Sequence, residues 1–297
     1  MREPCVLALG FFDGVHIGHG ALLRRAREVA DRLGCTAEAV SFDCHPATVV
    51  SGRTVPLLTA PRQRESLMRQ LYGIDALHIL HFDRRMMAMP WESFLADCLV
   101  YRLHAVYVVC GDDYRFGARG EGTAEQLKAW YEAHGYGCDV IPRVRMDGEI
   151  ISSTRIRGLL LRGDAAEAER LLGHPHEISG EVLYGFQKGR TIGVPTANIA
   201  FPPERLVPAY GVYAATATAE GADYNAVVNI GVHPSVGALP APVLEAHLLN
   251  FDKNIYGKPL TVRLHRMLRR EQTFPSLDAL RAQIRVDQEM AKRALAE

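Results

Sequence analysis

The sequence predicts an α/β protein in two parts, a domain built on a parallel sheet and then an antiparallel β-barrel domain with a terminal helix. In the first half, short apolar segments alternate with segments of helical spacing, a β-α order that gives parallel sheets. In the second half, β-rich segments follow one another with Gly and Pro between them, which favours a barrel. The 297 residues, 48% hydrophobic and 23% charged, suffice for two cores.

The elements of the first half follow from apolar spacing. Residues 5–9 form a short apolar strand, and the helix that ends at residue 33 is stopped by Gly34. Residues 105–110 are a continuous apolar run, as expected for a buried parallel strand. Strands are predicted at residues 5–9, 36–42, 76–82, 105–110 and 136–141, and helices at residues 22–33, 61–72, 91–103, 123–134, 154–161 and 165–172.

The second half predicts five strands and one long helix. The helix spans residues 277–295 and begins after Ser276, a favourable N-cap. The strands are predicted at residues 177–184, 211–219, 225–232, 243–250 and 260–267. The Gly-His-Pro segment at residues 173–175 separates the two patterns, so we expect domains at residues 1–173 and 174–297.

Charge and cysteine content limit the compartment and the partners. Lys plus Arg and Asp plus Glu both number 34, and neither half is basic, so we expect no nucleic-acid or membrane partner. All six cysteines lie in the first half without Cys-x-x-Cys spacing, which disfavours zinc and disulfides. Free thiols, with no signal peptide or transmembrane run, predict a cytoplasmic protein. A weak or transient homo-oligomer stays open.

The strongest motif is the turn at residues 10–19, Gly-Phe-Phe-Asp-Gly-Val-His-Ile-Gly-His. It follows the first predicted strand, where open α/β sheets bind ligands. Glycines let the backbone approach a phosphate, and a helix N-terminus offers N–H groups. His16 and His19 can donate to charge developing on a transferring phosphate. Alternatively the turn only starts a helix and its histidines are incidental, but Gly14 and Gly18 favour the functional interpretation.

A second group of motifs lies later in the chain. In Ile-Ser-Ser-Thr-Arg-Ile-Arg at residues 151–157, Ser153 and Thr154 can cap a helix and Arg157 can offer a planar fork to phosphate. The alternative is a simple N-cap with surface arginines. Two further motifs are Phe-Asp-Cys-His-Pro at residues 42–46 and Gly-Asp-Asp-Tyr-Arg-Phe-Gly at residues 111–117.

Two motifs of the second half carry oxygen-rich side chains. Gly-Arg-Thr-Ile-Gly-Val-Pro-Thr-Ala-Asn at residues 189–198 places Thr196 and Asn198 two residues apart, and such neutral oxygen ligands suit Mg²⁺. A Pro-containing turn is the alternative. In Glu-Ala-His-Leu-Leu-Asn-Phe from residue 245, a strand would put Glu245 and His247 on the face opposite the core. A solvated strand face is the alternative there.

Together these motifs resemble the bacterial bifunctional riboflavin kinase/FAD synthetase (FMN adenylyltransferase) family over nearly the whole chain. The resemblance implies a Rossmann-like nucleotidyltransferase domain followed by a riboflavin kinase barrel. The barrel would phosphorylate riboflavin to FMN with ATP, and the first domain would adenylylate FMN to FAD and release pyrophosphate. The chain departs from the family at Cys44, where Pro is usual, and at Asn250, where Asp is common.

The resemblance also implies the site residues. Glu245 would be the catalytic base of the kinase, with Mg²⁺ at Thr196 and Asn198, and His16 and His19 would be catalytic in adenylyl transfer. The ATP and phosphate site of the adenylyltransferase would comprise Gly10, Phe12, Asp13, Gly14, Gly18, Ser153, Thr154 and Arg157, with His45 and Asp113 as flavin or phosphate candidates. The kinase would bind ATP and flavin through Gly189, Gly193, Pro195, Thr196, Asn198, Tyr213 and Asn229.

Two other functions compete with this interpretation. His-Ile-Gly-His at residues 16–19 is similar to the ATP motif of class I aminoacyl-tRNA synthetases, but the chain lacks a Lys-Met-Ser-Lys-Ser-like loop. A non-catalytic nucleic-acid-binding module would have lost its acidic base and gained a basic stripe, whereas Glu245 is present and the charge is balanced. The chain also has neither a P-loop nor a Gly-x-Gly-x-x-Gly motif, so P-loop kinases and dinucleotide-binding dehydrogenases are disfavoured.

Overall fold

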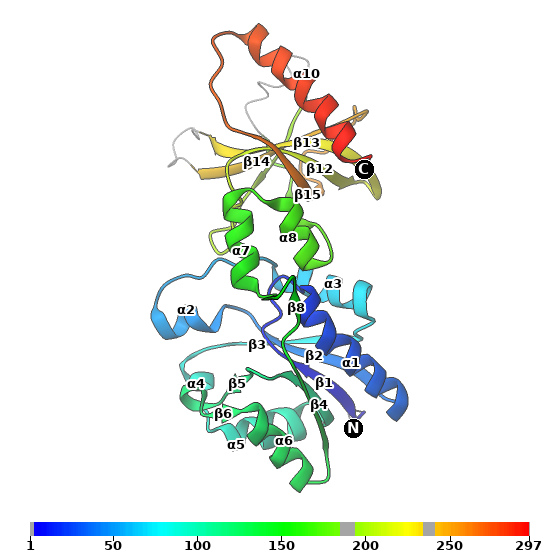
Figure 1. Cartoon of the computed structure of the whole chain (residues 1–297), viewed down its shortest axis with the longest axis vertical. Coiled ribbons are helices and arrows are strands. Elements are labelled where there is room, and N and C mark those ends of the chain that lie inside the picture. Colours follow the sequence, from blue (N-terminus) through cyan, green and yellow to red (C-terminus); the bar gives the residue numbers. More distant parts are fainter. Residues whose placement is uncertain (1–2, 185–193, 234–240, 297) are drawn as a thin grey trace. The chain divides into compact units, whose positions relative to one another are not determined.

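A computed structural model describes residues 3–184, 194–233 and 241–296 of the chain. It contains two compact units, Met1–Ser153 and Thr154–Glu297 (Figure 1). These units divide at residues 153 and 154, before the boundary expected from the sequence at residues 173 and 174.

The N-terminal unit is built on a five-stranded sheet in the order β3-β2-β1-β4-β7. Every neighbouring pair is parallel, which confirms the predicted sheet. β1 is buried along its whole length because it lies in the middle of the sheet. The strands are β1 (Cys5–Leu9), β2 (Thr36–Phe42), β3 (Ala76–Leu80), β4 (Ala105–Gly111) and β7 (Gly137–Ile141).

Helices cover both faces of this sheet. Because side chains alternate along β1, Val6 and Ala8 pack in one cluster with α1 and α3, whereas Leu7 and Leu9 pack in another with η1 and α6. The helices are α1 (Ile17–Leu33), α2 (Pro46–Ser51), α3 (Pro61–Tyr72), α4 (Arg84–Met87), α5 (Trp91–Ser93), the π-helix η1 (Phe94–Arg102), the 3₁₀ turn η2 (Ala118–Gly120) and α6 (Ala124–Ala133). Short strand pairs are β5 (Arg115–Phe116) with β6 (Gly122–Thr123) and β8 (Arg145–Met146) with β9 (Glu149–Ile150).

The C-terminal unit is a six-stranded antiparallel sheet in the order β10-β15-β12-β13-β14-β11, curved into a nearly closed barrel. A bridge between Leu183 and Asn198 joins its two ends, and Gly180 leaves room there for the side chain of Ile199. The strands are β10 (His176–Glu181), β11 (Ala197–Ala200), β12 (Gly211–Ala219), β13 (Ala222–His233), β14 (Ala241–Leu248) and β15 (Pro259–Arg270). β11 was not predicted, since its segment resembles a turn.

Three helices flank the barrel. α7 (Ser153–Arg162) and α8 (Ala165–Leu172) precede it, and α10 (Leu277–Ala294) follows it, capped by Ser276 as predicted. α10 covers the outer face of β12 and β13, where Ala291 packs against Val212 and Val227. Its buried Asp287 forms a bidentate ion pair with Arg269 of β15, with Nη2–Oδ2 at 2.8 Å and Nε–Oδ1 at 3.0 Å. Because the planar guanidinium of Arg269 holds both carboxylate oxygens of Asp287, this ion pair fixes α10 on the barrel.

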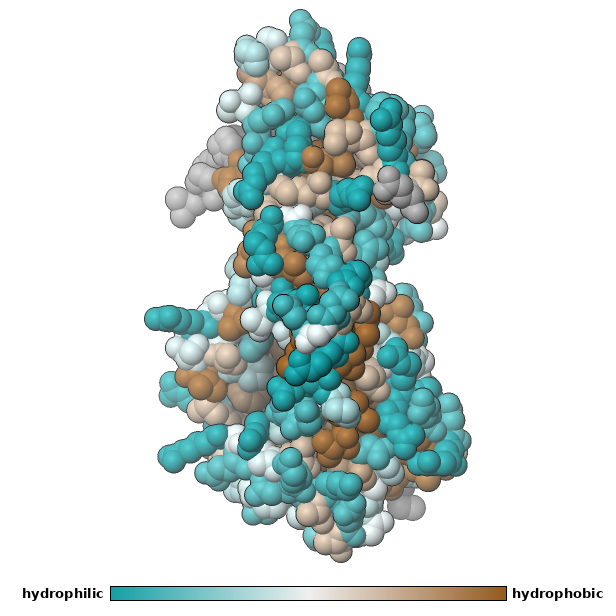
Figure 2. Space-filling model, in the orientation of Figure 1, coloured by the Kyte–Doolittle hydropathy of each residue, from teal (hydrophilic) through white to brown (hydrophobic). Residues whose placement is uncertain are grey.

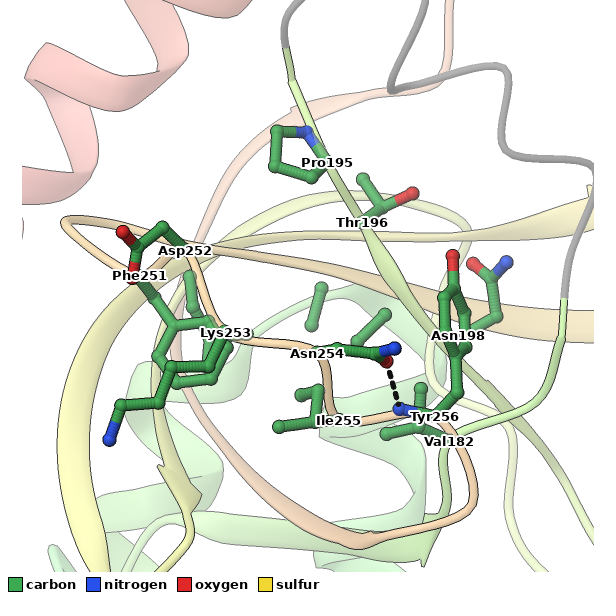
Figure 3. A pocket seen from close by; sticks show the side chains of 13 residues that line it. Val182, Pro195, Thr196, Asn198, Phe251, Asp252, Lys253, Asn254, Ile255 and Tyr256 are labelled. Atoms are coloured by element: carbon green, nitrogen blue, oxygen red, sulfur yellow. Dashed lines mark hydrogen bonds between the residues drawn. The ribbon is translucent and has the colours of Figure 1, made fainter.

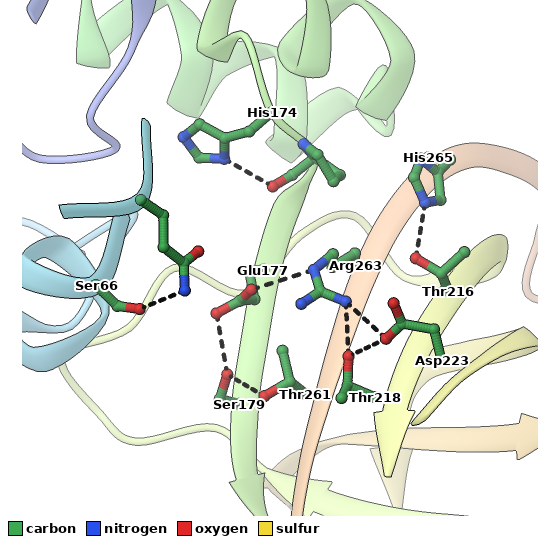
Figure 4. Close-up of polar contacts among 12 residues, drawn as sticks. Ser66, His174, Glu177, Ser179, Thr216, Thr218, Asp223, Thr261, Arg263 and His265 are labelled. Carbon is green, nitrogen blue, oxygen red and sulfur yellow. Dashed lines mark hydrogen bonds and ion pairs between the residues drawn. The ribbon is translucent and has the colours of Figure 1, made fainter. Parts of the chain in front are cut away.

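Polar contacts attach α8 to the barrel and link strands within it, and Figure 4 shows the strand contacts of His265 and Arg263. His265 of β15 lies between Glu169 of α8, 3.1 Å from Nδ1, and Thr216 of β12, 3.0 Å from Nε2. On the same sheet Arg263 contacts Glu177 at 3.4 Å and donates to the Thr218 hydroxyl at 2.8 Å. Ala165 of α8 belongs to the barrel's own core cluster, so α8 folds with the barrel.

The visible surface is mainly hydrophilic, with hydrophobic side chains in scattered patches (Figure 2). Among the described residues, none of the helices combines the length and the hydrophobicity needed to cross a bilayer.

The buried His176 makes the stability of the barrel depend on pH. Burial, and then the charges of Arg205 and His174, lower the pKa of His176 from 6.5 to about 3. The unfolded chain therefore binds more protons between these values, and the free energy of unfolding falls as the pH drops below about 6.5. We predict a loss of about 2 kcal/mol between pH 7 and pH 5.

Urea unfolding at pH 7 and pH 5, followed by circular dichroism, tests this prediction. Both tryptophans, Trp91 and Trp130, lie in the N-terminal unit, so their fluorescence follows that unit separately. In His176→Gln the pH-dependent loss should shrink in the barrel transition alone. An unchanged pH dependence in this variant would refute the role of His176.

Candidate active sites

The turn between β1 and α1 has a strained backbone. Phe12, Gly14 and Val15 all adopt positive φ angles, of 56°, 85° and 43°. Such a conformation is rare for a β-branched residue like Val15 and costs roughly 1–3 kcal/mol at each non-glycine position. Strain of this kind persists only where surrounding contacts fix it, and it concentrates at functional sites.

The buried carboxylate of Asp13 supplies those contacts. It accepts hydrogen bonds from the backbone N–H of Leu58 at 3.0 Å and from that of Thr59 at 2.9 Å. The Thr59 hydroxyl also donates to Asp13, at 3.2 Å, and accepts the N–H of Gly14 at 2.9 Å. The Ser153 hydroxyl donates to the Asp13 carbonyl at 2.8 Å, so Ser153 also contacts the turn.

His16 and His19 are stacked at the start of α1. Their ring centroids lie 3.5 Å apart with planes 14° from parallel. His16 is the N-cap, and its Nδ1 accepts the backbone N–H of His19 at 3.2 Å, so the neutral ring carries its proton on Nε2. Gly18 makes room for this ring, since a Cβ there would lie 3.1 Å from it.

His19 is a neutral imidazole at pH 7. Burial, and then the charges of His16 and Arg64, lower its pKa well below the usual value of 6.5. Its buried Nδ1 has no hydrogen-bond partner among the described residues. An uncharged ring with an unused nitrogen beside a helix N-terminus suits an anionic ligand more than a protein partner.

The other motifs of this unit meet at the same edge of the sheet. His45 follows β2 and caps α2, with Nδ1 accepting the N–H of Ala47 at 3.1 Å. Its ring packs edge to face with that of Phe11, at a centroid distance of 4.9 Å. Asp113 is exposed just after β4. Because β2, β1 and β4 are adjacent, these residues line the carboxyl edge where α/β sheets bind ligands.

Other residues predicted for this site lie in the core or on α7. Phe12 is fully buried in the core beneath the turn. Its ring packs closely on Gly10, where the Cβ of any other residue would lie 3.0 Å from the ring. Thr154 and Arg157 lie on α7, in the C-terminal unit. The thiol of Cys44, which stands where the family usually has Pro, lies 3.7 Å from the Phe82 carbonyl. Burial raises the pKa of this thiol.

Sequence reasoning missed two buried residues of this site, Thr59 and Arg64. The signal for Arg64 was present, because it shares helical spacing with Leu67 and Met68, the buried residues of α3. A charged residue at a core position indicates a specific role.

In the barrel, the strand register aligns three polar side chains. Asn198 of β11 lies opposite Glu245 of β14, and Glu245 lies opposite Asn229 of β13. Leu244 and Ala246 are fully buried while Glu245 is half-buried, so the predicted facing of this strand is confirmed. His247, on the same face, hydrogen-bonds the Pro195 carbonyl through Nδ1 at 2.8 Å.

A cavity of about 230 Å³ is lined by Asn198, at one end of this row, but not by Glu245 or Asn229 (Figure 3). Most of its lining comes from two segments: the start of β11, with Thr196 and Asn198, and the loop of residues 251–256. Asn254 shapes that loop by accepting the N–H of Tyr256 at 3.1 Å. The lining is partly apolar and partly polar, comprising Val182, Pro195, Thr196, Ala197, Asn198, Ala246, Leu248, Phe251, Asp252, Lys253, Asn254, Ile255 and Tyr256. It therefore suits a ligand with both a ring and polar groups.

The residues predicted for Mg²⁺ fit a hard cation. Thr196 directly precedes β11 and Asn198 lies within it, and both residues line the cavity. The buried Oδ1 of Asn198 has no hydrogen-bond partner among the described residues, although such an oxygen normally has one. A cation that takes oxygen ligands would satisfy it.

Other kinase residues lie elsewhere. Tyr213 is fully buried in the barrel core, where its hydroxyl donates to the Ala209 carbonyl at 2.5 Å and burial raises its pKa to about 12. It is not among the residues that line the cavity. Asn250 has a positive φ of 58°, a conformation that Asn tolerates well. Gly189 and Gly193 lie outside the described residues.

Comparison with protein families identifies both units. A family model described as FAD synthetase matches residues 1–155, and one described as riboflavin kinase matches residues 172–295.

Individual relatives are similar over nearly the whole chain. A bifunctional riboflavin kinase/FMN adenylyltransferase of Haemophilus influenzae is 35% identical over 98% of this chain and 94% of its own length. A protein of the same name from Escherichia coli K12 is 38% identical over 98% and 93%. A solved Streptococcus pneumoniae structure, named as a macrolide-efflux protein, has a TM-score of 0.87 at 29% identity, covering 98% of this chain and 95% of that one.

The two family models follow one another along the chain, and the relatives are more than 30% identical over nearly its whole length. The chain belongs to the bifunctional riboflavin kinase/FMN adenylyltransferase family, and it phosphorylates riboflavin to FMN and adenylylates FMN to FAD.

Proposed function

We propose that the two reactions run at two separate sites, adenylyl transfer within residues 1–173 and riboflavin phosphorylation within residues 174–297. The observation that carries the proposal is the presence of two distinct polar constellations, the stacked His16–His19 pair and the Asn198–Glu245–Asn229 row. The family models, which match residues 1–155 and 172–295, support the same division.

In the kinase, Glu245 acts as the general base. The 5′-hydroxyl of riboflavin loses its proton to the Glu245 carboxylate while its oxygen attacks the γ-phosphorus of ATP, and ADP leaves. Asn198 and Asn229 flank the carboxylate on neighbouring strands, and rigid strands hold it in place. Pro195, Thr196 and Asn198 then contact the nucleotide and flavin in the adjoining cavity.

Thr196 and Asn198 would hold Mg²⁺ together with the nucleotide phosphates. When bound, this ion offsets the negative charge of the phosphates and helps to orient them. His247 keeps the segment in register through its hydrogen bond to the Pro195 carbonyl. Gly189 and Gly193 complete the proposed motif by sequence.

In adenylyl transfer, an FMN phosphate oxygen attacks the α-phosphorus of ATP and pyrophosphate leaves. FMN already carries the nucleophile, so no covalent enzyme intermediate is needed. His16 and His19 donate hydrogen bonds to the transferring phosphoryl group, where charge builds up. Gly10, Gly14 and Gly18 allow close backbone approach, Phe12 and Asp13 support the turn, and Ser153, Thr154 and Arg157 hold the departing phosphates, with His45 and Asp113 toward the flavin nucleotide.

The proposed partners are therefore ATP, riboflavin and FMN, with no nucleic acid or membrane. All six cysteines are free thiols, which fits a reducing cytoplasm. A weak or transient homo-oligomer is compatible with this scheme.

Glu245→Gln tests the kinase site. The amide keeps the size of the side chain but cannot accept the proton, so riboflavin phosphorylation should fall by about 10²–10⁴-fold. FMN supplied directly should still become FAD at the normal rate. Glu289→Gln, an exposed carboxylate on α10, is the matched control and should leave both rates unchanged. The measurement is chromatography of riboflavin, FMN and FAD, and a near-normal kinase rate in Glu245→Gln would refute the base.

His19→Ala tests the adenylyltransferase site. Loss of one donor to the transferring phosphate should slow FAD formation from FMN by roughly 10²–10³-fold while FMN formation persists. His134→Ala, at the exposed end of α6, serves as the control. If both reactions slowed equally, His19 would act through folding or a shared site.

Two fragments test the division of labour. Residues 174–297 retain every proposed kinase residue, and residues 154–297 add α7 and α8. Both should make FMN and neither should make FAD. The shorter fragment should melt at a lower temperature, since it loses Ala165 from the barrel core and the Glu169–His265 contact. FAD produced by either purified fragment would contradict the assignment.

A further inference from the structure

Arg64 is a fully buried charged side chain directly beneath the adenylyltransferase site. It lies on α3 with Leu67 and Met68, on the face of the helix that packs against the sheet. Removing a guanidinium from water costs free energy unless its N–H groups are well hydrogen-bonded. A hydrophobic residue would fill this position at less cost, so the contacts of Arg64 explain why an arginine is there.

Those contacts join the ends of two strands. Nη1 of Arg64 donates to the carbonyls of Phe11 at 3.0 Å and Phe42 at 3.1 Å, and to the Ser41 hydroxyl. The Ser41 hydroxyl in turn donates to the Phe11 carbonyl at 2.6 Å. Nη2 of Arg64 reaches the Thr59 carbonyl at 3.4 Å. One side chain thus ties the segment after β1 to the end of β2 and to the segment before α3.

The Phe11 ring extends this connection toward His45. The Arg64 guanidinium lies over the ring, 4.6 Å from its centroid, and the ring meets His45 edge to face at 4.9 Å. Phe11 also directly precedes Phe12, where the left-handed backbone of the turn begins. The position of Phe11 therefore affects both the strained turn with its histidines and the His45 motif.

We propose that Arg64 is a positioning residue for adenylyl transfer: it fixes Phe11 and the end of β2 so that the His16–His19 pair and His45 keep their reactive arrangement. This inference rests on the proposed role of the two histidines. Arg64 touches no reacting atom in this scheme. It acts through the Phe11 carbonyl and ring, and its permanent positive charge acts on His19.

Lysine could supply the charge but not the geometry. A guanidinium is planar, offers five N–H donors and stacks on aromatic rings, whereas an ammonium is a single point of charge. The charged groups that act on His19 are His16, from the same turn, and Arg64, from α3. A lysine at position 64 would keep the positive charge of Arg64. It would lose the stacking on the Phe11 ring and the planar arrangement of N–H donors.

The test compares Arg64→Lys and Arg64→Gln with Arg69→Gln, an exposed position on the same helix whose arginine pairs with Glu65. In full-length protein, kcat for FAD formation from FMN should fall about 10–100-fold in both Arg64 variants, the size of effect that a small misplacement of catalytic groups produces. KM for ATP and FMN should change far less, and Arg69→Gln should match the original protein. Riboflavin phosphorylation should be unchanged in all three variants.

The pKa of His19, measured by NMR titration of its ring, separates positioning from mere stability. It should rise in Arg64→Gln and stay low in Arg64→Lys, because only the glutamine removes the charge. If the variants lowered the melting temperature but left kcat per folded molecule unchanged, the inference would be overturned. Arg64→Lys keeps the test valid if Arg64→Gln does not fold.

His19→Ala, measured in parallel, distinguishes two failures. Normal kcat in the Arg64 variants beside a slow His19→Ala would overturn the role of Arg64 alone. Normal FAD formation in His19→Ala would instead refute the proposed function of the histidines, on which the inference rests.

Discussion

The buried Asp13 carboxylate is the contact on which the N-terminal site depends. Its hydrogen bonds to Leu58 and Thr59 fix the left-handed turn from Phe12 to Val15, a backbone that would relax without them. This turn sets where α1 begins, and thereby sets the stacked histidines over the helix N-terminus. The burial that stabilises the turn also keeps His19 neutral, so local folding and the chemistry of the site have the same physical cause.

The barrel builds its site by a different constraint, the register of three neighbouring strands. Antiparallel pairing puts Asn198, Glu245 and Asn229 side by side, and the alternation of side chains turns this row away from the alanine-rich interior. A shift of one residue in β14 would exchange Glu245 with a buried neighbour. The two sites therefore rely on unrelated structural devices, a strained turn and a strand register.

Sequence reasoning located the periodic elements and the motifs but not the contacts that hold them. The bounds of β1, β2 and α3 were predicted without error, since each is a regular apolar pattern ended by Gly or turn residues. β11 was missed because four residues after a proline carry no periodic signal, and only pairing with β14 makes them a strand. Thr59 and Arg64 were missed because their partners are backbone groups brought together by the fold.

The central claim, that each reaction has its own site, is tested most directly by mixing two inactivated proteins. Glu245→Gln and His19→Ala are each incubated with riboflavin, ATP and Mg²⁺, alone and together, and the flavins are separated. The account predicts almost no product from the first alone, FMN from the second alone, and FAD from the mixture, because FMN made by one protein is adenylylated by the other. FAD formed at the normal rate by either variant alone would contradict it.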